Sequence, residues 1–354
     1  MDTTARARLK QHLISWATAA PLSGPAGAGA GVGTLVLADA AHIPAVTAAG
    51  LVGPRTLLLA PDDGTGDLAP AVGYQGSLTE PGDEFSNGQD FFLQTHAYAA
   101  SPFMTVFGPT VVRVFDRHDF EAFLADADRA LAEGVFPEFL ITSSVLLADP
   151  AALSGAPDPA DGPALRLYAD RNGQLSTSPT GAVLGTVEDG LDILTERFAR
   201  TGSGAAALDA ALPAGTRAEA LRARPFLARY LEAVGALRSL MARGATGLRV
   251  SGFGSRLTPG LAESGADADL ADPTLPIVLY TDADPGGEGE AYIVAGSRLF
   301  AVDRRAAQAL ECLLATAGEP GDLVPAAELD QLADLLSRHD LPLPGPVRVP
   351  VAAR

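Results

Sequence analysis

Histidines are the residues whose chemistry is most easily tested against sequence spacing, and the chain has His12, His42, His96, His118 and His339. None of them stands in an H-x-x-x-H or H-E-x-x-H spacing, so no two imidazoles are placed to share a metal ion. His118 has carboxylates beside it, in Asp116-Arg117-His118-Asp119. That setting suits a catalytic histidine, but a capped helix start is favoured. For His96, after an aromatic stretch, a pocket-lining role and a structural role both stay open.

Signals for a nucleophile or a phosphate-binding loop are weak. The chain has no G-x-S-x-G elbow and no P-loop. A Gly/Ala-rich stretch at 21–33 precedes a predicted strand, whereas a dinucleotide-binding loop follows one. Residues 251–256 (SGFGSR) resemble an anion-binding glycine turn with Arg256 as counter-charge, although a simple bend is favoured. We therefore predict no catalytic residue, no metal site and no cofactor.

Composition and charge exclude several classes of protein. The chain has 354 residues, of which 47% are hydrophobic, and a formal net charge of -18. This charge repels phosphate backbones, and no arginine cluster offsets it, so nucleic acid is not an expected partner. The single cysteine, Cys312, excludes an internal disulfide and lies in an apolar helical pattern typical of a core residue. No apolar run is long enough for a span, so we expect a cytoplasmic protein without membrane contact.

The first three quarters of the chain alternate strand and helix patterns. We predict a helix and a Gly/Ala linker in residues 1–33, with Leu9, Leu13, Trp16 and Ala17 at helical spacing, and a mixed α/β domain over residues 34–270. The residues in 61–102 are predicted to form short strands or a binding loop. In the larger region, strands are predicted at 34–38, 55–60, 110–115 and 138–147, and helices at 119–133 and 187–200.

Two turn signals organise the middle of the chain. Asn172-Gly173 suits a tight hairpin turn between the flanking strands 165–169 and 174–178. A predicted helix over 217–243 contains Pro225, which either kinks the helix or marks its true start.

The most orderly pattern lies in residues 275–345. Predicted strands at 277–281, 291–295 and 298–302 are separated by a Gly-rich turn and by Gly296-Ser297. Asp303 is placed to cap a following helix, and a Leu-rich helix is predicted at 326–339. Three antiparallel strands followed by helices predict an α+β chain with a C-terminal winged-helix module.

A family resemblance appears in the same region. The stretch EAYIVAGSRLFAVDRRAAQALECLLATAGEPGD, followed by LDQLADLLSRHDL, resembles the peptide-recognition element of pathways that modify ribosomally made peptides. The prototype is the small peptide chaperone of pyrroloquinoline quinone biosynthesis. The resemblance rests on the turn between the second and third strands, on FAVD before the first helix, and on the Leu-rich last helix; the connection 318–327 is shorter than in the family. A large N-terminal domain with this module behind it is similar to the recognition proteins of daptide-type peptide clusters.

The resemblance implies a groove between the third strand and the last helix, where an extended leader peptide adds as a further strand. The strand residues carried over are Arg298, Leu299, Phe300, Ala301 and Val302. On the last helix, the residues outside the buried Leu stripe could face the peptide, and these are Asp330, Ala333, Asp334, Ser337 and Arg338. Because side chains alternate along a strand, the core-facing set is either Leu299 and Ala301 or Arg298, Phe300 and Val302. We favour Arg298, Phe300 and Val302 as partly core residues. In the competing interpretation these apolar residues only fill the core.

Two functions from different classes follow. The leading hypothesis is a non-catalytic recognition and scaffold protein that holds the leader of a precursor peptide and delivers the rest to modifying enzymes. In daptide-like clusters the resemblance gives these partners as an oxidative decarboxylase, an aminotransferase and a methyltransferase. The alternative is a divergent peptide-modifying enzyme with a fused leader-binding module. A transcription regulator is a third option, and the acidic charge argues against it.

Overall fold

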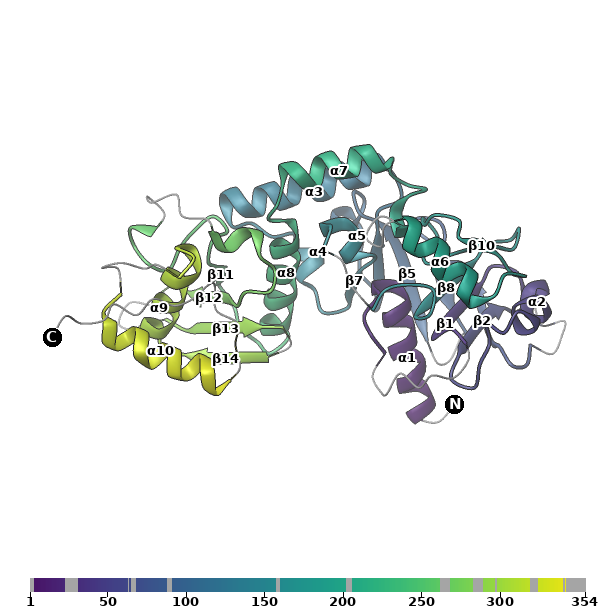
Figure 1. Cartoon of the computed structure of the whole chain (residues 1–354), viewed down its shortest axis with the longest axis horizontal. Coiled ribbons are helices and arrows are strands. Elements are labelled where there is room, and N and C mark those ends of the chain that lie inside the picture. Colours follow the sequence, from purple (N-terminus) through teal and green to yellow (C-terminus); the bar gives the residue numbers. More distant parts are fainter. Residues whose placement is uncertain are drawn as a thin grey trace. The chain divides into compact units, whose positions relative to one another are not determined.

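The chain folds into two compact units of mixed α and β structure (Figure 1). Unit 1 comprises Met1–Phe123 and Ser144–Leu221, and unit 2 comprises Leu124–Ser143 and Arg222–Arg354. The computed structural model describes residues 3–22, 31–62, 64, 68–87, 91–156, 160–201, 206–261, 268–282, 289–296, 298–318, 324–339 and 341. Most of the predicted linker, residues 23–30, lies outside these ranges. No helix of the described ranges is both long enough and apolar enough to cross a membrane.

Unit 1 is built on a ten-stranded sheet with the strand order β10-β9-β8-β1-β2-β3-β4-β5-β6-β7. Its strands are β1 (Thr34–Leu37), β2 (Leu57–Pro61), β3 (Val72–Gly76), β4 (Glu84–Ser86), β5 (Phe92–Ala97), β6 (Thr110–Arg113), β7 (Val145–Leu147), β8 (Arg166–Ala169), β9 (Gln174–Ser176) and β10 (Gly185–Thr186). Strands β4 and β9 run antiparallel to their neighbours, and the other pairs are parallel. Parallel strands are usually buried on both faces, and β1 and β8 are buried at every position.

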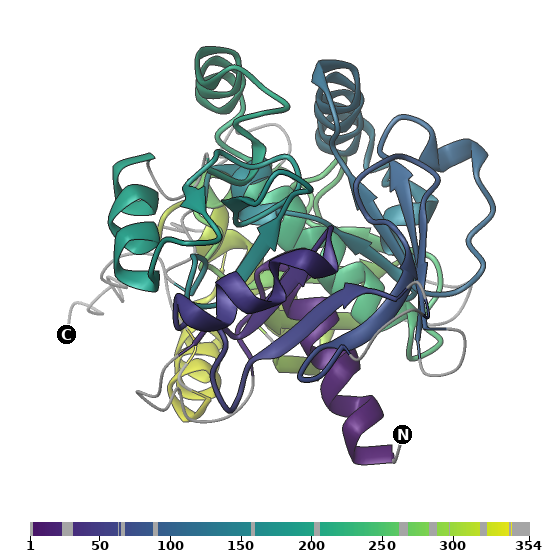
Figure 2. The ribbon, with the colours of Figure 1, turned by 90° about the vertical axis from the view of Figure 1, so that its right-hand side faces the viewer.

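The sheet rolls around the N-terminal helix α1 (Thr3–Thr18). Leu9, Leu13, Trp16 and Ala17 of α1 pack in one cluster with inward side chains of β1 to β6 and of β8. The helix also contacts β7, which is separated from β8 by seven positions in the strand order. Figure 2 shows α1 lying against the strands. The predicted helical spacing of these four residues is therefore confirmed, and the helix fills the interior of the sheet.

The opposite face of the sheet packs against short helices. Leu35 and Leu37 of β1 alternate with the inward Val36 and join a second cluster that includes Val46, Leu194 and other side chains of the helices α2 and α6. The remaining helices of unit 1 are η1 (Ala40–His42), α2 (Ile43–Ala48), η2 (Ser101–Phe103), α5 (Pro150–Ser154), α6 (Leu191–Thr201), η3 (Ala206–Leu208) and α7 (Ala214–Ala223), and α3 (Arg117–Glu133) continues into unit 2.

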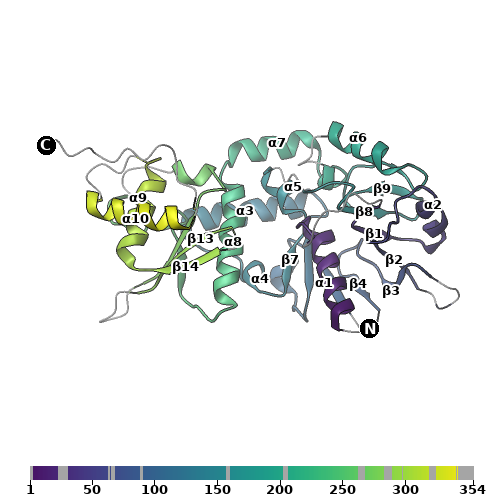
Figure 3. The same ribbon diagram turned by 60° about the horizontal axis from the view of Figure 1, so that its bottom comes forward.

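Unit 2 contains a four-stranded antiparallel sheet in the order β11-β12-β13-β14. Its elements are α4 (Glu138–Ile141), α8 (Leu227–Met241), β11 (Leu248–Val250), η5 (Ala268–Ala271), β12 (Ile277–Thr281), β13 (Ala291–Ala295), β14 (Arg298–Val302), α9 (Arg304–Ala315) and α10 (Ala326–Arg338). One face of this sheet packs against α9 and α10, with Ile293, Leu310 and Leu332 in a single apolar cluster. Ile277 and Leu279 alternate to the other face and are buried as well, and α8 contacts β12. Figure 3 shows these helices together with β13 and β14.

The sequence predicted the C-terminal strands and helices closely. Asp303 caps α9 as expected, with its carboxylate accepting from the Ala306 amide at 2.8 Å. Cys312 is fully buried in the apolar cluster. The sheet, however, has a fourth strand, because β11 pairs with β12 in front of the three strands predicted. The predicted hairpin at Asn172-Gly173 is confirmed by the antiparallel pairing of β8 and β9, with Gly173 at φ +74°.

Two other predictions need correction. The predicted strand 138–147 is instead the helix α4 followed by β7, because a short apolar run does not by itself distinguish helix from strand. Phe139 and Leu140 are buried, and α4 packs on α8. The predicted helix 217–243 is two helices, α7 and α8, divided at Pro225. Proline lacks the amide hydrogen that a continuous helix needs, so the second role considered for Pro225 is correct.

Candidate functional site

The strand β14 is the outermost strand of the sheet in unit 2. Its register with β13 pairs Arg298 with Ala295, Phe300 with Ile293, and Val302 with Ala291. All three partners on β13 are buried, and Phe300 and Val302 pack against the apolar cluster of unit 2. The expectation that Arg298, Phe300 and Val302 are partly core residues therefore holds for Phe300 and Val302 and is wrong for Arg298, which is exposed.

The backbone of β14 divides by the same alternation. In an antiparallel pair, residues exchange both backbone hydrogen bonds at every second position. Ala295 and Arg298 are paired three positions apart in the chain, the spacing at which an antiparallel connection hydrogen-bonds its two ends. By alternation, Phe300 also bonds to β13, and the N–H and C=O groups of Leu299 and Ala301 point to the open edge. An added strand would use these groups.

The face of β14 opposite the core is only partly covered. Leu299 is half-buried and Ala301 is exposed. Their partners on β13, Val294 and Tyr292, are half-buried and lie on the same face. The edge strand thus presents apolar side chains at the surface on this face, while Phe300 is half-buried on the other. A peptide paired with β14 would find apolar contacts above and below its backbone.

The C-terminal end of α10 lies against β14. The Nη1 group of Arg298 donates to the backbone carbonyl of His339, and the rings of Phe300 and His339 are 4.8 Å apart between centroids. His339 is the C-cap residue of α10. The contacts of Arg298 and Phe300 therefore hold one end of the predicted groove.

The helix residues predicted to line the groove are exposed or half-exposed. Ala333 is half-buried, and Asp334, Ser337 and Arg338 are exposed, while Leu329, Leu332 and Leu336 are buried. The predicted division of α10 into a Leu stripe and a polar side is thus observed at these positions. The side chain of Asp330 lies outside the described part of the structure.

The glycine turn at residues 251–256, one candidate anion site, is occupied by a carboxylate of the chain itself. Glu311 of α9 is fully buried and accepts hydrogen bonds from the Ser251 hydroxyl at 2.6 Å, the Leu257 amide at 2.7 Å and the Thr258 amide at 2.6 Å. Arg256 donates to the same Ser251 hydroxyl at 3.3 Å. Glu311 therefore fixes the loop to the core of unit 2 and takes the place that an external anion would need.

A buried charge network lies inside unit 1, around Asp149. One carboxylate oxygen of Asp149 accepts from Arg166 Nη1 at 2.6 Å, and the other accepts from the Ser178 hydroxyl at 2.8 Å. The Ser178 hydroxyl in turn accepts from Arg113 Nη1 at 2.9 Å. All four residues are almost completely buried, and Asp149 has left-handed backbone angles, with φ 51°. Such a conformation costs a non-glycine residue about 1–2 kcal/mol, so the surrounding bonds must hold it.

The network continues to the N-terminal helix. Arg166 forms a two-pronged pair with Asp161, at 2.8 and 2.9 Å, and its Nη1 also donates to the Trp16 carbonyl at 3.0 Å. The Trp16 indole donates to the Leu167 carbonyl at 3.0 Å, and the Arg113 guanidinium lies 5.8 Å from the centroid of the indole ring. The charges of two arginines and two aspartates balance. The network thus joins α1 to both sides of the rolled sheet, and both arginines reach Asp149, Arg166 directly and Arg113 through Ser178, while the Nε group of Arg113 is buried without a hydrogen-bond partner among the described residues.

The histidines have structural surroundings. His118 is exposed at the start of α3, and Asp119 caps that region by accepting from the Ala99 and Phe115 amides, each at 2.9 Å. His96 is buried in β5, and burial lowers the pKa of its imidazole. Within the described ranges no group of three or more His, Cys, Asp or Glu side chains could hold a metal ion.

The sequence did not predict that His339 lies against β14. The residue stands at the end of the Leu-rich pattern, where it appeared only as the last residue of a predicted helix. Its contact with Phe300 depends on how α10 packs across the sheet, which no local spacing reveals. Comparison of the chain with protein-family models, with curated proteins and with solved structures found no match.

Proposed function

We propose that this chain binds the leader of a ribosomally made precursor peptide by strand addition to β14 and presents the peptide to separate modifying enzymes. The observation that carries the proposal is the position of β14 at the edge of its sheet, with the backbone groups of Leu299 and Ala301 directed outward. Backbone bonds along such an edge give affinity that depends little on peptide sequence, and side-chain contacts add the specificity.

In this proposal β12, β13, β14, α9 and α10 form a winged-helix-type peptide-recognition module. The order of three antiparallel strands followed by two helices supports it. So does the contact of Arg298 and Phe300 with His339, which sets the end of α10 beside the strand that would receive the peptide. The added strand β11 extends the sheet at the side away from β14 and leaves the proposed edge free. The partner enzymes would be a decarboxylase, an aminotransferase and a methyltransferase. Because the leader is tethered to this protein, the rest of the peptide would be held near these enzymes at a raised effective concentration.

The direct test is binding of a fluorescently labelled candidate leader, the N-terminal segment of any short peptide encoded next to this chain, to the full chain by fluorescence anisotropy. We expect saturable binding with a Kd in the micromolar range or tighter, and clearly weaker binding of a scrambled leader of the same composition, which keeps the backbone bonds and loses the side-chain contacts. Absence of saturable binding would reject the proposal.

A second experiment separates a scaffold from a modifying enzyme. The precursor peptide is incubated with this protein alone and then with the partner enzymes added, and its mass is measured in both samples. The proposal predicts an unchanged mass in the first sample and modification in the second. A mass change produced by this protein alone would favour the catalytic alternative.

A further inference from the structure

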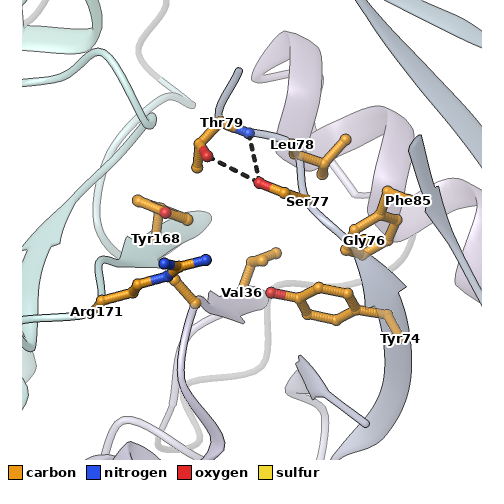
Figure 4. Close-up of a pocket in the computed structure, with 10 residues that line it drawn as sticks. Val36, Tyr74, Gly76, Ser77, Leu78, Thr79, Phe85, Tyr168 and Arg171 are labelled. Atoms are coloured by element: carbon orange, nitrogen blue, oxygen red, sulfur yellow. Dashed lines mark hydrogen bonds between the residues drawn. The ribbon is translucent and has the colours of Figure 1, made fainter. Parts of the chain in front are cut away.

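A small pocket lies at the carboxyl ends of three parallel strands of unit 1 (Figure 4). The chain enters it after β1 at Ala38, after β3 at Ser77 and after β8 at Arg171. The carboxyl ends of parallel strands are where α/β sheets commonly bind ligands. The pocket has a volume of about 50 Å³. That is room for a group of a few heavy atoms, well below the size of a drug-sized ligand site.

The loop after β3 is shaped by Gly76. Its φ is +87°, and a Cβ atom at this position would lie 1.7 Å from the carbonyl oxygen of Glu84. Only glycine fits here, and the turn carries Ser77 and Thr79 into the lining. The Ser77 hydroxyl accepts from the Thr79 amide at 3.1 Å and lies 2.8 Å from the Thr79 hydroxyl (Figure 4). Two hydroxyl groups are thereby fixed on one side of the pocket.

Arg171 brings a positive charge to the pocket. No carboxylate of the described ranges lies within salt-bridge distance of its guanidinium, in contrast to the paired Arg166. Its backbone is anchored, because its carbonyl accepts from His42 Nε2 at 3.3 Å. In Figure 4 the guanidinium lies beside Tyr168 and faces the space that the Tyr74 hydroxyl also faces. Arg171 is exposed, so its guanidinium stands at the mouth of the pocket with its backbone anchored and, within the described ranges, no carboxylate at salt-bridge distance.

Two tyrosines complete the polar lining. The Tyr74 hydroxyl donates to the Leu37 carbonyl at 2.6 Å, so its oxygen is fixed and its ring forms a wall. Burial, with a further contribution from Asp170, raises the pKa of Tyr168 to about 12. The Tyr168 hydroxyl therefore keeps its proton at neutral pH and can donate a hydrogen bond.

We propose that this pocket binds the carboxylate of a small organic acid, with Arg171 as the counter-charge and with Tyr168, Ser77 and Thr79 as hydroxyl partners. A guanidinium matches a planar carboxylate with two parallel donors. The apolar side chains of the lining, among them Val36, Leu78 and Phe85, would receive the attached hydrocarbon. The site is independent of peptide binding at β14.

A carboxylate fits this lining better than a phosphate dianion. Asp170 and Glu80 both act electrostatically on Tyr168, so their negative charges are felt in the pocket and repel a dianion more strongly than a monoanion. Arg171 is the one cationic side chain among the lining residues, and a single guanidinium balances the charge of a carboxylate but not that of a phosphate dianion.

The test is calorimetric titration of the full chain with acetate, propionate, benzoate and inorganic phosphate, each at constant ionic strength set with sodium chloride. Emission of Trp16, the only tryptophan, is a second readout, because its ring lies 6.3 Å from that of Tyr168. Variants Arg171→Gln, Arg171→Lys and Tyr168→Phe are compared with Arg117→Gln, which removes an exposed arginine of α3. Circular dichroism checks the fold of each.

We expect saturable binding of at least one of the three carboxylates at low millimolar concentration or below, weakened at least tenfold by Arg171→Gln and several-fold by Tyr168→Phe. Arg171→Lys should lie between wild type and Arg171→Gln, and Arg117→Gln should bind as wild type does. Three outcomes would overturn the proposal: no saturable binding of any of the carboxylates, equal binding by the Arg171→Gln and Arg117→Gln variants, or a preference for phosphate over every carboxylate.

Discussion

The aromatic ring of Phe300 lies 4.8 Å from the imidazole of His339, with the two ring planes inclined by 52°. Phe300 belongs to the edge strand β14, and His339 is the C-cap of α10. The contact therefore links the strand that would pair with a peptide to the helix that would border it. Arg298, on the same strand as Phe300, adds a second link because its guanidinium donates to the His339 carbonyl.

Replacement of His339 by alanine should loosen this link. The Phe300 ring would lose one aromatic neighbour, and pairs of this kind contribute about 0.5–1.5 kcal/mol. We expect a decrease of about 1 kcal/mol in the free energy of unfolding and a weaker leader affinity. Urea denaturation and anisotropy measure the two effects, with His118→Ala, at an exposed histidine of unit 1, as the control. A variant that binds and unfolds as wild type does would show that the contact is not important for the groove.

Replacement of Ala301 by proline should remove peptide binding and leave the fold intact. Proline is tolerated on an edge strand where the missing N–H faces solvent, and the Ala301 amide points to the open edge. The incoming strand loses one backbone bond and meets the proline ring, so we expect affinity to fall at least tenfold. Ala301→Thr keeps the amide and is the matched control. If proline and threonine at this position bind the leader equally, strand addition at β14 is wrong.

Neutralisation of Asp149 should destabilise unit 1 strongly. In Asp149→Asn, Arg113 and Arg166 remain buried with only Asp161 as a counter-charge. Removal of one partner from a buried pair typically costs about 3–5 kcal/mol. Urea denaturation should show a loss of that size. The control is Glu121→Gln, since its pair with Arg117 is exposed, at 56% and 70% of the side-chain surface, and should contribute less than about 1 kcal/mol. A loss under 1 kcal/mol in Asp149→Asn would contradict a stabilising role for the network.

The C-terminal elements were predictable because their signals are local. Asp303 as a helix cap and the alternation of Phe300 and Val302 can each be inferred from a few neighbouring residues. The rolled sheet was not predictable in this way. Its order brings β8 beside β1 and the N-terminal helix, so Arg166 of β8 donates to the carbonyl of Trp16, which is far away in the chain. No periodicity encodes such a pairing.

The candidate sites differ in the same respect. The outward positions of Leu299 and Ala301 follow from strand alternation, whereas His339 comes to lie beside Phe300 of β14 only through tertiary packing. The pocket of unit 1 brings together Tyr74 of β3, Tyr168 of β8 and Arg171 just after β8, and the strand order that places them near one another is itself a tertiary feature. Each of these residues looks ordinary within its own stretch of sequence.

The stability of unit 1 should fall as the pH drops below about 6.5. His12 is buried on α1, with Nδ1 2.8 Å from the Thr34 hydroxyl, and burial together with the Arg8 charge lowers the pKa of His12 to about 4. In the unfolded chain His12 takes up a proton near pH 6.5, whereas in the folded chain it does so only near pH 4. The contribution to stability is complete above pH 6.5 and is lost between pH 6.5 and 4, at up to about 1.4 kcal/mol per pH unit.

Urea denaturation from pH 7.5 to 4.5 tests this dependence, with the slope in wild type compared with that in His12→Gln. Glutamine can keep a hydrogen bond to Thr34 and does not titrate, so its slope should be shallower. His118→Gln, at an exposed site, is the control. Equal slopes for wild type and His12→Gln would rule out His12 as a source of the dependence.

The central claim is that a leader peptide adds to β14 as a strand. Residue-resolved amide hydrogen exchange, followed by NMR on the labelled full chain with and without the leader, reports on it most directly. The account predicts slowed exchange at the amides of Leu299 and Ala301 when the peptide is bound, with exchange at Phe300, which already bonds to β13, changing less. Saturable leader binding with unchanged exchange at both Leu299 and Ala301, and protection confined to unit 1, would contradict it.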